Sequence, residues 1–412
     1  MDMPFPSADA SAPLTSTIPE VAFVLELGRT MQAFGVSAST LENALGRVAA
    51  HLGLEGAVFA TPTGFLASLR KEGSHSKTYL MRVDAGRSSL EKLAEAESLV
   101  DLVLTDRLDV QEARQHLAAL TVRPARFGPG LKVAAHGLAA MGMADVFGGG
   151  WREVLFGALV GLLVGFAVHL AQQRRNLGRL APLLGGLLSA LAGGVISRWL
   201  PSVSYPILAL SGIIGLLPGL GLLVAMQELG TGNLVSGTAR MAGTGLVFVL
   251  LAFGVGLGQT LGGLLPGPAE PLGLPGWTLV PAIALVALGY LIIFQGRLVD
   301  YGWTLAASAL AWSTAHLATH YLGPVAGAGI AALVLGAGCN HYARRTRRPG
   351  AVLLLPSLML ILPGSLGLHS LTLMMQQQTL EGLQAGFQSM SVTVALMLGL
   401  LMANAMVSRR TF

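Results

Sequence analysis

A series of long apolar segments constrains the fold more than any other feature of this chain. Ten segments follow one another from residue 131 onward: 131–148, 152–170, 182–199, 206–226, 239–262, 277–296, 302–320, 323–342, 351–371 and 387–407. Most approach the roughly 20 residues that a helix needs to cross a bilayer. The composition agrees, with 53% hydrophobic and 11% charged residues and a mean hydropathy of +0.64. We therefore expect a mainly α-helical polytopic membrane protein with ten transmembrane segments.

Basic residues are unevenly distributed between the loops. If the N-terminus is cytosolic, the loops on that side hold Arg123, Arg126, Lys132, Arg174, Arg175, Arg179, Arg240, Arg297, Arg344, Arg345, Arg347, Arg348, Arg409 and Arg410, and the opposite loops hold only Arg152 and Arg198. Such an excess marks cytoplasmic loops, so both termini are predicted to be cytoplasmic. The net charge of +5 then reflects the basic residues that orient the chain in the membrane. Nucleic acid is therefore not an expected partner.

The N-terminal part of the chain has a different pattern. Residues 1–17 contain no basic n-region and no apolar h-region, so we expect a disordered N-terminus without a signal peptide. Residues 18–130 are predicted to form a small cytosolic α+β domain. Its first helix would bury Val21, Val24, Leu25, Leu27 and Met31 and stop near Gly35, and Ser37 or Ser39 would cap a second helix.

The rest of this predicted domain follows from short-range patterns. Strands are expected within 56–71 and 75–83, around the turn Thr61-Pro62-Thr63-Gly64. Two amphipathic helices are expected near 88–104 and 109–120. Their wet sides would carry Glu91, Glu95, Glu97, Asp101 and Arg107.

One broken apolar stretch occurs twice in the membrane region. Residues 206–237 contain Pro218-Gly219 and Gly237, and residues 351–382 contain Pro363-Gly364 and Gly382; both pairs are separated by 145 positions (363 − 218 and 382 − 237). A constant offset indicates an internal repeat. Proline and glycine predict that a helix breaks at each point. The polar stretch after each break is expected to be too long for a tight turn.

The repeat predicts the architecture. Weaker matches at the same offset pair Arg152 with Arg297, Gly254 with Gly399, and Gln259 with Asn404. The boundaries 131–265 and 272–410 assign five helices to each copy, and an odd number means that the second copy is inverted in the membrane. Inverted repeats with broken helices are typical of secondary transporters. Whether 206–226 and 351–371 span the bilayer or are re-entrant is left open.

Polar residues gather around and after the two breaks. The candidate substrate-binding residues are Pro218, Gly219, Glu228, Asn233, Ser236, Arg240, Pro363, Gly364, Ser365, His369 and Gln388. A helix that restarts after a break points free backbone donors at the gap, which suits a carboxylate. Glu228 and His369 are the proton-coupling candidates. The alternatives are a Glu228–Arg240 pair at the cytosolic edge and a His369 that is hydrogen-bonded between helices.

Other polar residues have weaker patterns. His136 and Asp145 would line a cavity or, for Asp145, snorkel; Gln259 and Asn404 would line the pathway or hydrogen-bond across the bundle. Glu381 is expected to be a solvated loop carboxylate. His316 and His320 have the spacing of a metal-binding pair, but no carboxylate or cysteine accompanies them, so structural roles are favoured. The single cysteine, Cys339, excludes an internal disulfide. No metal and no cofactor are predicted.

The ordered motifs resemble a known family. The pattern LGRTMQAFGVSASTLENALGRVAAHLGL with TPTG, then LLPGL and SGTAR, then PSLMLILPGSLG, is similar to the threonine/serine exporter family in its fused two-half form, from about residue 20 to 407. The resemblance implies a multi-pass protein of the bacterial inner membrane that exports small hydroxy amino acids and is driven by the proton motive force. Some members of this family are associated with dicarboxylate export.

The leading hypothesis is therefore a secondary transporter, not an enzyme, that exports threonine and serine by proton antiport and alternating access. Export of a dicarboxylate such as succinate is the alternative substrate class. A membrane-embedded hydrolase with a Ser365–His369 dyad and a passive channel are hypotheses from other classes. The expected partners are the substrate, protons and the lipid bilayer. A homo-oligomer is left open, as is the role of the soluble domain as regulator, gate, dimerisation module or stabilising cap.

Overall fold

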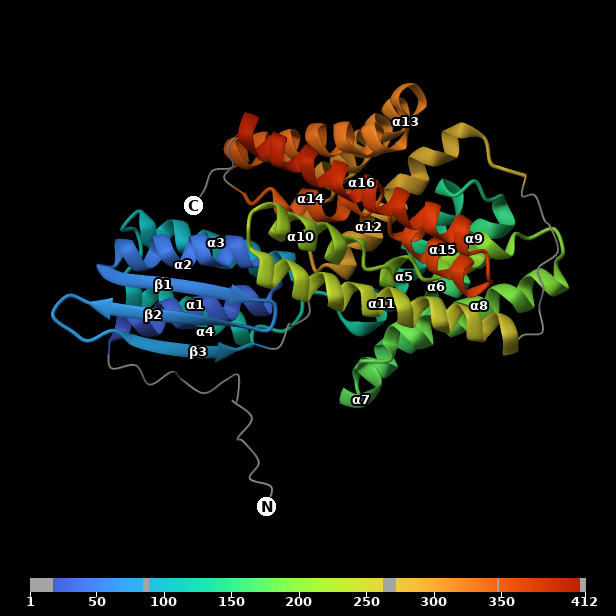
Figure 1. Ribbon diagram of the computed structural model, residues 1–412. Coiled ribbons are helices and arrows are strands. Elements are labelled where there is room, and N and C mark those ends of the chain that lie inside the picture. The colour runs from blue at the N-terminus through green and yellow to red at the C-terminus, as the bar shows by residue number, and fades with distance from the viewer. Residues whose placement is uncertain (1–17, 84–88, 262–271, 347, 408–412) are drawn as a thin grey trace, which may run out of the picture. The chain divides into compact units, whose positions relative to one another are not determined.

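The chain forms two compact units (Figure 1). The computed structural model describes residues 18–83, 89–261, 272–346 and 348–407. Within them, the N-terminal unit contains 18–124 and 228–239, and the helical unit contains 125–227 and 240–407. The predicted boundaries, 18–130 and 131–265, do not anticipate that 228–239 packs into the N-terminal unit. The predicted disordered segment 1–17 and the repeat ends at 265 and 410 lie outside the described residues.

The N-terminal unit is an α+β fold, as predicted. Its elements are α1 (Pro19–Ala33), α2 (Ala38–His51), β1 (Leu54–Thr61), β2 (Gly64–Lys71), β3 (Lys77–Arg82), α3 (Leu90–Leu104) and α4 (Val110–Val122). The strands form an antiparallel sheet in the order β1-β2-β3. Ser37, and not Ser39, caps α2, because its hydroxyl accepts from the backbone N–H of Thr40.

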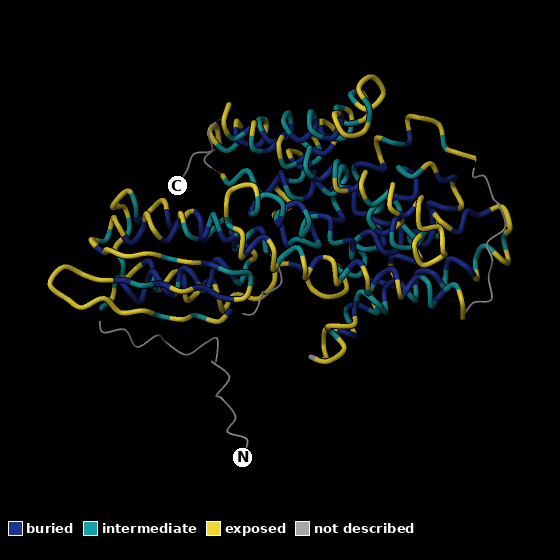
Figure 2. Tube along the Cα trace, viewed as in Figure 1, coloured by how far each residue is buried: buried dark blue, intermediate teal, exposed yellow. Residues whose placement is uncertain are grey.

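The core of this unit lies between one face of the sheet and the helices (Figure 2). Alternation along β2 buries Phe65, Ala67 and Leu69 and exposes Leu66, as the period of a strand requires. The five apolar residues predicted to lie inward on α1 are all buried. The prediction for Glu97 is wrong, since its side chain is buried on α3 and not on the wet side.

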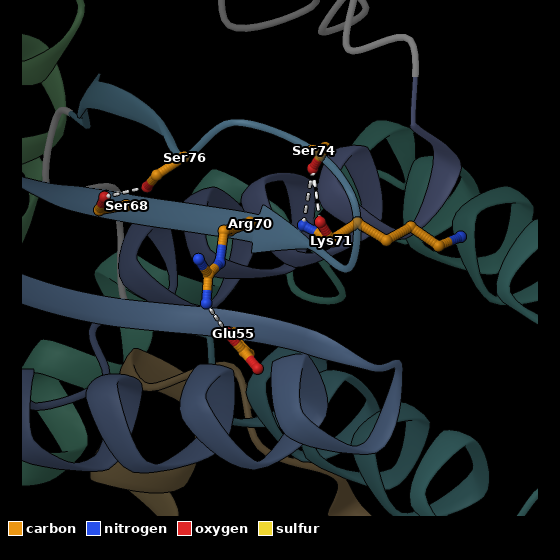
Figure 3. A network of polar contacts seen from close by, with 6 residues as sticks. All are labelled: Glu55, Ser68, Arg70, Lys71, Ser74 and Ser76. Carbon is orange, nitrogen blue, oxygen red and sulfur yellow. Dashed lines mark hydrogen bonds and ion pairs between the residues drawn. The ribbon is translucent and has the colours of Figure 1, made fainter.

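The opposite face of the sheet carries polar contacts at one end (Figure 3). Arg70 on β2 pairs with Glu55 on β1, which lies directly across from it. The hydroxyls of Ser68 and Ser76 are 3.0 Å apart, and Ser74 closes the turn after β2 by donating to the carbonyl of Lys71. These exposed pairs stabilise the cross-strand register.

The helical unit contains a helix for every predicted apolar segment. Its elements are α5 (Pro129–Val146), α6 (Trp151–Gln172), α7 (Arg175–Gly178), α8 (Ala181–Trp199), α9 (Tyr205–Gly212), η1 (Ile214–Leu216), α10 (Gly219–Gly230), α11 (Leu234–Leu261), η2 (Gly276–Thr278), α12 (Leu279–Ile293), η3 (Leu298–Asp300), α13 (Tyr301–Thr346), α14 (Ala351–Leu358), α15 (Gly364–Met375) and α16 (Thr379–Met406). Among the described residues, six helices are long and apolar enough to cross a membrane, or seven if the bent pair α9 and η1–α10 forms one span. The chain is thus a membrane protein by its helices.

Helix α13 joins two of the predicted segments. It has 46 residues, which corresponds to about 70 Å, more than twice the hydrocarbon core of a bilayer. Gly323 interrupts it with φ 82° and ψ 168°, directly before Pro324. This kink lies between the predicted segments 302–320 and 323–342, so α13 consists of two helices.

Both Pro-Gly stretches are broken, as predicted. In the first, α9 ends at Gly212, the short η1 follows, and α10 begins at Gly219. The bend between α9 and the η1–α10 segment is 41°. In the second, α14 ends at Leu358 and α15 begins at Gly364. The polar stretch after each break is predicted to be too long for a tight turn, and this prediction is wrong. Only three residues separate α10 from α11 and α15 from α16, because the polar residues continue the helices.

The two copies match residue by residue around these turns. The bounds of α15 and α16 lie 145 positions after those of α10 and α11 (364 − 219, 375 − 230, 379 − 234 and 406 − 261). Gly237 packs against Leu229, and Gly382 packs against Met374, which is the equivalent residue. Gly254 lies against the carbonyl of Leu183 on α8, and Gly399 lies against that of Gly329 on α13. The glycine matches found in the sequence therefore bring equivalent helices together.

The turns also share a left-handed residue. Gly232 has φ 85° and Gln377, at the equivalent position, has φ 66°. A glutamine in this region is strained by its Cβ, whereas glycine is not. We expect Gln377→Gly to stabilise the protein by about 1 kcal/mol. The thermal midpoint of the purified protein in detergent should rise.

The reverse exchange in the first copy is the matched control. A Cβ at Gly232 would meet no atom within 4 Å, so Gly232→Gln introduces backbone strain without a clash. It should lower the thermal midpoint. Equal shifts of the same sign for both variants would contradict this account of the turns.

Candidate functional site

The two breaks touch each other in the helical unit. A Cβ added at Gly219 would lie 3.1 Å from the Cβ of Leu362 and 3.7 Å from the Cα of Gly364. A Cβ added at Gly364 would lie 3.2 Å from the Cβ of Leu217 and 3.8 Å from the Cα of Gly219. Since Leu362 and Gly364 are the equivalents of Leu217 and Gly219 (362 − 217 and 364 − 219), each break makes the same contact with the other. The two copies therefore touch through equivalent residues.

Backbone carbonyls at the breaks accept hydrogen bonds from neighbouring helices. The hydroxyl of Tyr290, on α12, donates to the carbonyl of Ile214 in η1 at 3.0 Å. The hydroxyl of Ser389, on α16, donates to the carbonyl of Pro363 at 3.2 Å. Both side chains are buried. The bond from Tyr290 satisfies a carbonyl that would be costly in an apolar environment, and the bond from Ser389 adds to the one that Pro363 already accepts from the N–H of Gly367.

Two hydroxyl residues occupy equivalent positions beside the breaks. Thr244 on α11 and Ser389 on α16 are separated by 145 positions and are both buried. A Cβ at Gly221 would lie 2.7 Å from the hydroxyl oxygen of Thr244, and one at Gly367 would lie 3.4 Å from that of Ser389. Neither was among the residues predicted from the sequence, although the 145-residue offset pairs them.

Side chains of other helices also pack near the two breaks. The ring of Phe248, on α11, would meet a Cβ at Gly367 of α15 at 3.2 Å, so the first copy reaches the second. The imidazole of His136, on α5, lies against Gly215 of η1, where an added Cβ would be 2.8 Å from its Cε1. His136 therefore packs beside the turn that leads into the first break. The predicted cavity partner, Asp145, is buried near the end of the same helix.

The other predicted site residues are spread over several places. Ser365 is half-buried on the first turn of α15, and His369 is exposed one turn later. No hydrogen bond joins these two side chains in the part of the chain that the structure describes. Arg240 is half-buried on α11. Gln388 is exposed, and it lines an open groove of about 460 Å³ together with Val325, Leu383, Gln384, Phe387 and Ser391.

Three of the predicted residues belong to the N-terminal unit. Glu228 is fully buried and accepts a hydrogen bond from the backbone of Ala38, and Ser236 is buried and donates to the carbonyl of Ala60. Asn233 lies in the turn between them, where its amide donates to the hydroxyl of Thr231. The structure therefore does not bring these three together with the breaks.

The remaining polar residues have structural partners. Asn404 accepts from the amide of Asn340 at 3.0 Å, and Gln259 accepts from Gln376 at 3.5 Å, so both amides bond across helices. His316 stacks on Trp312, and His320 contacts Tyr321 edge-on. Within the described residues, no group of three or more histidine, cysteine or acidic side chains is placed to hold a metal ion.

Two buried acids were not singled out from the sequence. Glu153, at the start of α6, accepts from the backbone N–H groups of Gly150 and Ser204, both at 2.9 Å. Asp300 pairs with Arg348 at 2.6 Å. Each holds the beginning of a helix in place, and neither contacts a break residue through these bonds. The glutamate had a detectable signal, because it lies three residues after Gly150 at a helix start.

Comparisons with known proteins agree on one family. A family model described as "Putative threonine/serine exporter" matches residues 22–262, and a second, described as "Threonine/Serine exporter, ThrE", matches residues 278–406. Among individual relatives, an uncharacterized protein of Schizosaccharomyces pombe is 25% identical over 365 residues, covering 84% of this chain and 47% of the relative. Pheromone-regulated membrane protein 10 of Candida albicans is 26% identical over 249 residues, covering 58% of this chain and 22% of the relative.

A bacterial relative carries a functional name. The threonine/serine exporter of Corynebacterium glutamicum is 26% identical over 340 residues, covering 75% of this chain and 64% of the relative. The chain spans about half or less of the length of the two yeast relatives named above. No solved structure matches it. Because the first family model covers more than half of the residues, the chain belongs to the threonine/serine exporter family.

Proposed function

We propose that this chain exports threonine and serine across a membrane as a secondary transporter, with the substrate held at the two breaks. The family is one of exporters and not of enzymes, which sets the hydrolase hypothesis aside. The observation that carries the proposal is the reciprocal contact between Gly219 and Gly364. Broken helices that meet at the interface of two repeats are where transporters bind their substrates.

The chemistry of the breaks suits a small hydroxy amino acid. Helices α10 and α15 begin at Gly219 and Gly364, so the first backbone N–H groups of each lack a partner within the helix. Together with the positive end of the helix dipole, these groups favour the substrate carboxylate. The hydroxyls of Thr244 and Ser389 and the half-buried Ser365 then supply partners for the substrate ammonium and hydroxyl. Gln388 and Arg240 would contact the substrate before it reaches the breaks.

The transport cycle follows from the repeat. Each copy contributes five apolar segments, and an odd number inverts the second copy, so the two halves would rock around the breaks in alternating access. This arrangement makes ten spans, with both termini in the cytoplasm if the distribution of arginines sets the orientation. The resemblance implies a bacterial protein, so we place export in the inner membrane.

Proton coupling needs a titratable group near the substrate. Glu228 is engaged by the N-terminal unit, which makes it a weaker candidate than the sequence indicates. His136 packs against the turn before the first break, and His369 lies one turn into α15 after Ser365. An imidazole ring can both accept and donate a proton. We therefore assign the proton-coupling role to these two histidines.

The function is tested with purified full-length protein in liposomes. Vesicles are preloaded with radiolabelled threonine, serine or succinate, and release is measured with and without an imposed pH gradient. We expect threonine and serine to move and the gradient to accelerate them. Movement of succinate alone would replace the substrate class with dicarboxylates, and flux insensitive to the gradient would favour a channel.

The breaks are tested by adding bulk. At Gly219 or Gly364, valine would press against the leucine of the opposite break, which already lies near van der Waals contact. Overpacking costs about 1–3 kcal/mol, so each variant should lower the export rate by about tenfold or more. Gly302→Val is the matched control, since a Cβ there meets no atom within 4 Å. Unchanged export by both break variants would remove this site from the proposal.

The hydroxyl beside the second break gives a finer test. Ser389→Ala removes one of the two hydrogen bonds to the carbonyl of Pro363 and leaves the bond from the N–H of Gly367, at a cost of about 1 kcal/mol. Threonine export should fall about fivefold, while Ser389→Thr should retain it, because threonine occupies the equivalent position 244. Ser391→Ala is the control, since that exposed hydroxyl bonds only to Phe387 of its own helix turn. Initial rates against threonine concentration distinguish these outcomes.

A further inference from the structure

A buried carboxylate ties the end of a broken-span helix to the N-terminal unit. Glu228 lies two residues before the end of α10, and its Oε1 accepts from the backbone N–H of Ala38 at 3.0 Å, across 190 positions of sequence. Its side chain is fully buried. Ala38 is the first residue of α2, so the carboxylate sits at the positive end of that helix. A charge in this position is stabilised by the helix that it caps.

A second tie follows on the other side of the same turn. The buried hydroxyl of Ser236, near the start of α11, donates to the carbonyl of Ala60 at 2.6 Å. The N–H of Ala60 donates to the carboxylate of Glu42 at 2.7 Å. Ala60 lies on β1, an edge strand of the described sheet, so side chains cover backbone groups that would otherwise be open at this edge. The α10–α11 turn is therefore held on both sides.

The equivalent turn of the second copy has neither tie. The positions that correspond to Glu228 and Ser236 are Leu373 and Glu381 (228 + 145 and 236 + 145), and neither residue type reproduces its counterpart. The α15–α16 turn, 376–378, is exposed. Since both turns have the same backbone geometry, a helical hairpin of this kind forms without such ties. The hydrogen bonds of Glu228 and Ser236 are therefore not required for the turn to fold, and they have another role.

We propose that the N-terminal unit is a docking platform for the α10–α11 turn, and that Glu228 and Ser236 are positioning residues for transport. Helix α10 runs for 12 residues from the break at Gly219 to this turn, about 18 Å. Breaking the contact would remove the acceptor that Glu228 gives to the buried N–H of Ala38, which is unfavourable. The turn thus moves together with the N-terminal unit, and the position of that unit is passed along α10 to the first break.

This role rests on the proposed transport function. It is tested by whether a covalent bridge between the α10–α11 turn and β1 restores export to a variant that has lost the Glu228 contact. The experiment uses the full chain in liposomes in a Cys339→Ser background, with Glu228→Ala alone and combined with Ala60→Cys and Ser236→Cys. We expect Glu228→Ala to lower threonine export about tenfold and to raise hydrogen exchange within 228–239 and at the start of α2. Bridging the two introduced thiols with a short bifunctional reagent should restore export, and cleavage of the bridge should remove it again.

Controls separate positioning from folding. Glu381→Ala removes an exposed carboxylate from the first turn of α16, at the position equivalent to Ser236, and should leave export unchanged. Ser236→Ala, which deletes one hydrogen bond, provides a milder variant if Glu228→Ala does not fold; it should reduce export about threefold.

Two results would overturn the proposal. The first is full export by Glu228→Ala with unchanged exchange, and the second is a bridged protein that stays inactive. If the unmodified chain moves no threonine but Glu228→Ala still exposes 228–239 to exchange, the transport function fails while the docking stands.

Discussion

The structure of the helical unit depends on the close approach of two broken helices. A helix break leaves carbonyl and N–H groups without partners, and an apolar environment offers none. At the first break Tyr290 supplies a donor from a neighbouring helix, and at the second Ser389 adds a donor to a carbonyl that also accepts from Gly367. Glycine on both sides allows the backbones to approach, since a Cβ at Gly219 or Gly364 would already press on the leucine of the opposite break. The same glycines leave N–H groups available for a ligand.

The two copies are alike where helices pack and unlike where they meet other parts of the protein. Matched glycines at 237 and 382, and at 254 and 399, pack against equivalent neighbours. Small residues of this kind allow close helix packing in membranes, where apolar surface alone gives little attraction between helices. In contrast, only the first copy carries the Glu228 and Ser236 contacts. In the proposed docking, the N-terminal unit therefore acts on the first copy and not on the second.

The buried polar residues divide into two kinds. Glu153, Asp300 and Asn404 have partners that complete helix starts or join neighbouring helices, so their burial is explained by structure. Thr244, Ser389 and His136 lie against the breaks themselves. Polar groups at membrane depth are expensive unless paired or used. The second kind therefore supplies the polar groups that the proposed site would use.

The sequence by itself determined the positions of the apolar helices, the repeat, both breaks and the N-terminal α+β pattern, because hydrophobic period, proline, glycine and a constant offset are local signals. It also indicated Pro218-Gly219 and Pro363-Gly364 as candidate substrate-binding residues. Only the tertiary structure decided that Glu228 and Ser236 join the N-terminal unit, that the polar stretches continue the helices, and that Thr244, Ser389 and Tyr290 serve the breaks. Those outcomes depend on contacts between residues far apart in the chain, such as the 190 positions between Ala38 and Glu228. No local pattern encodes which distant backbone group a buried side chain will satisfy.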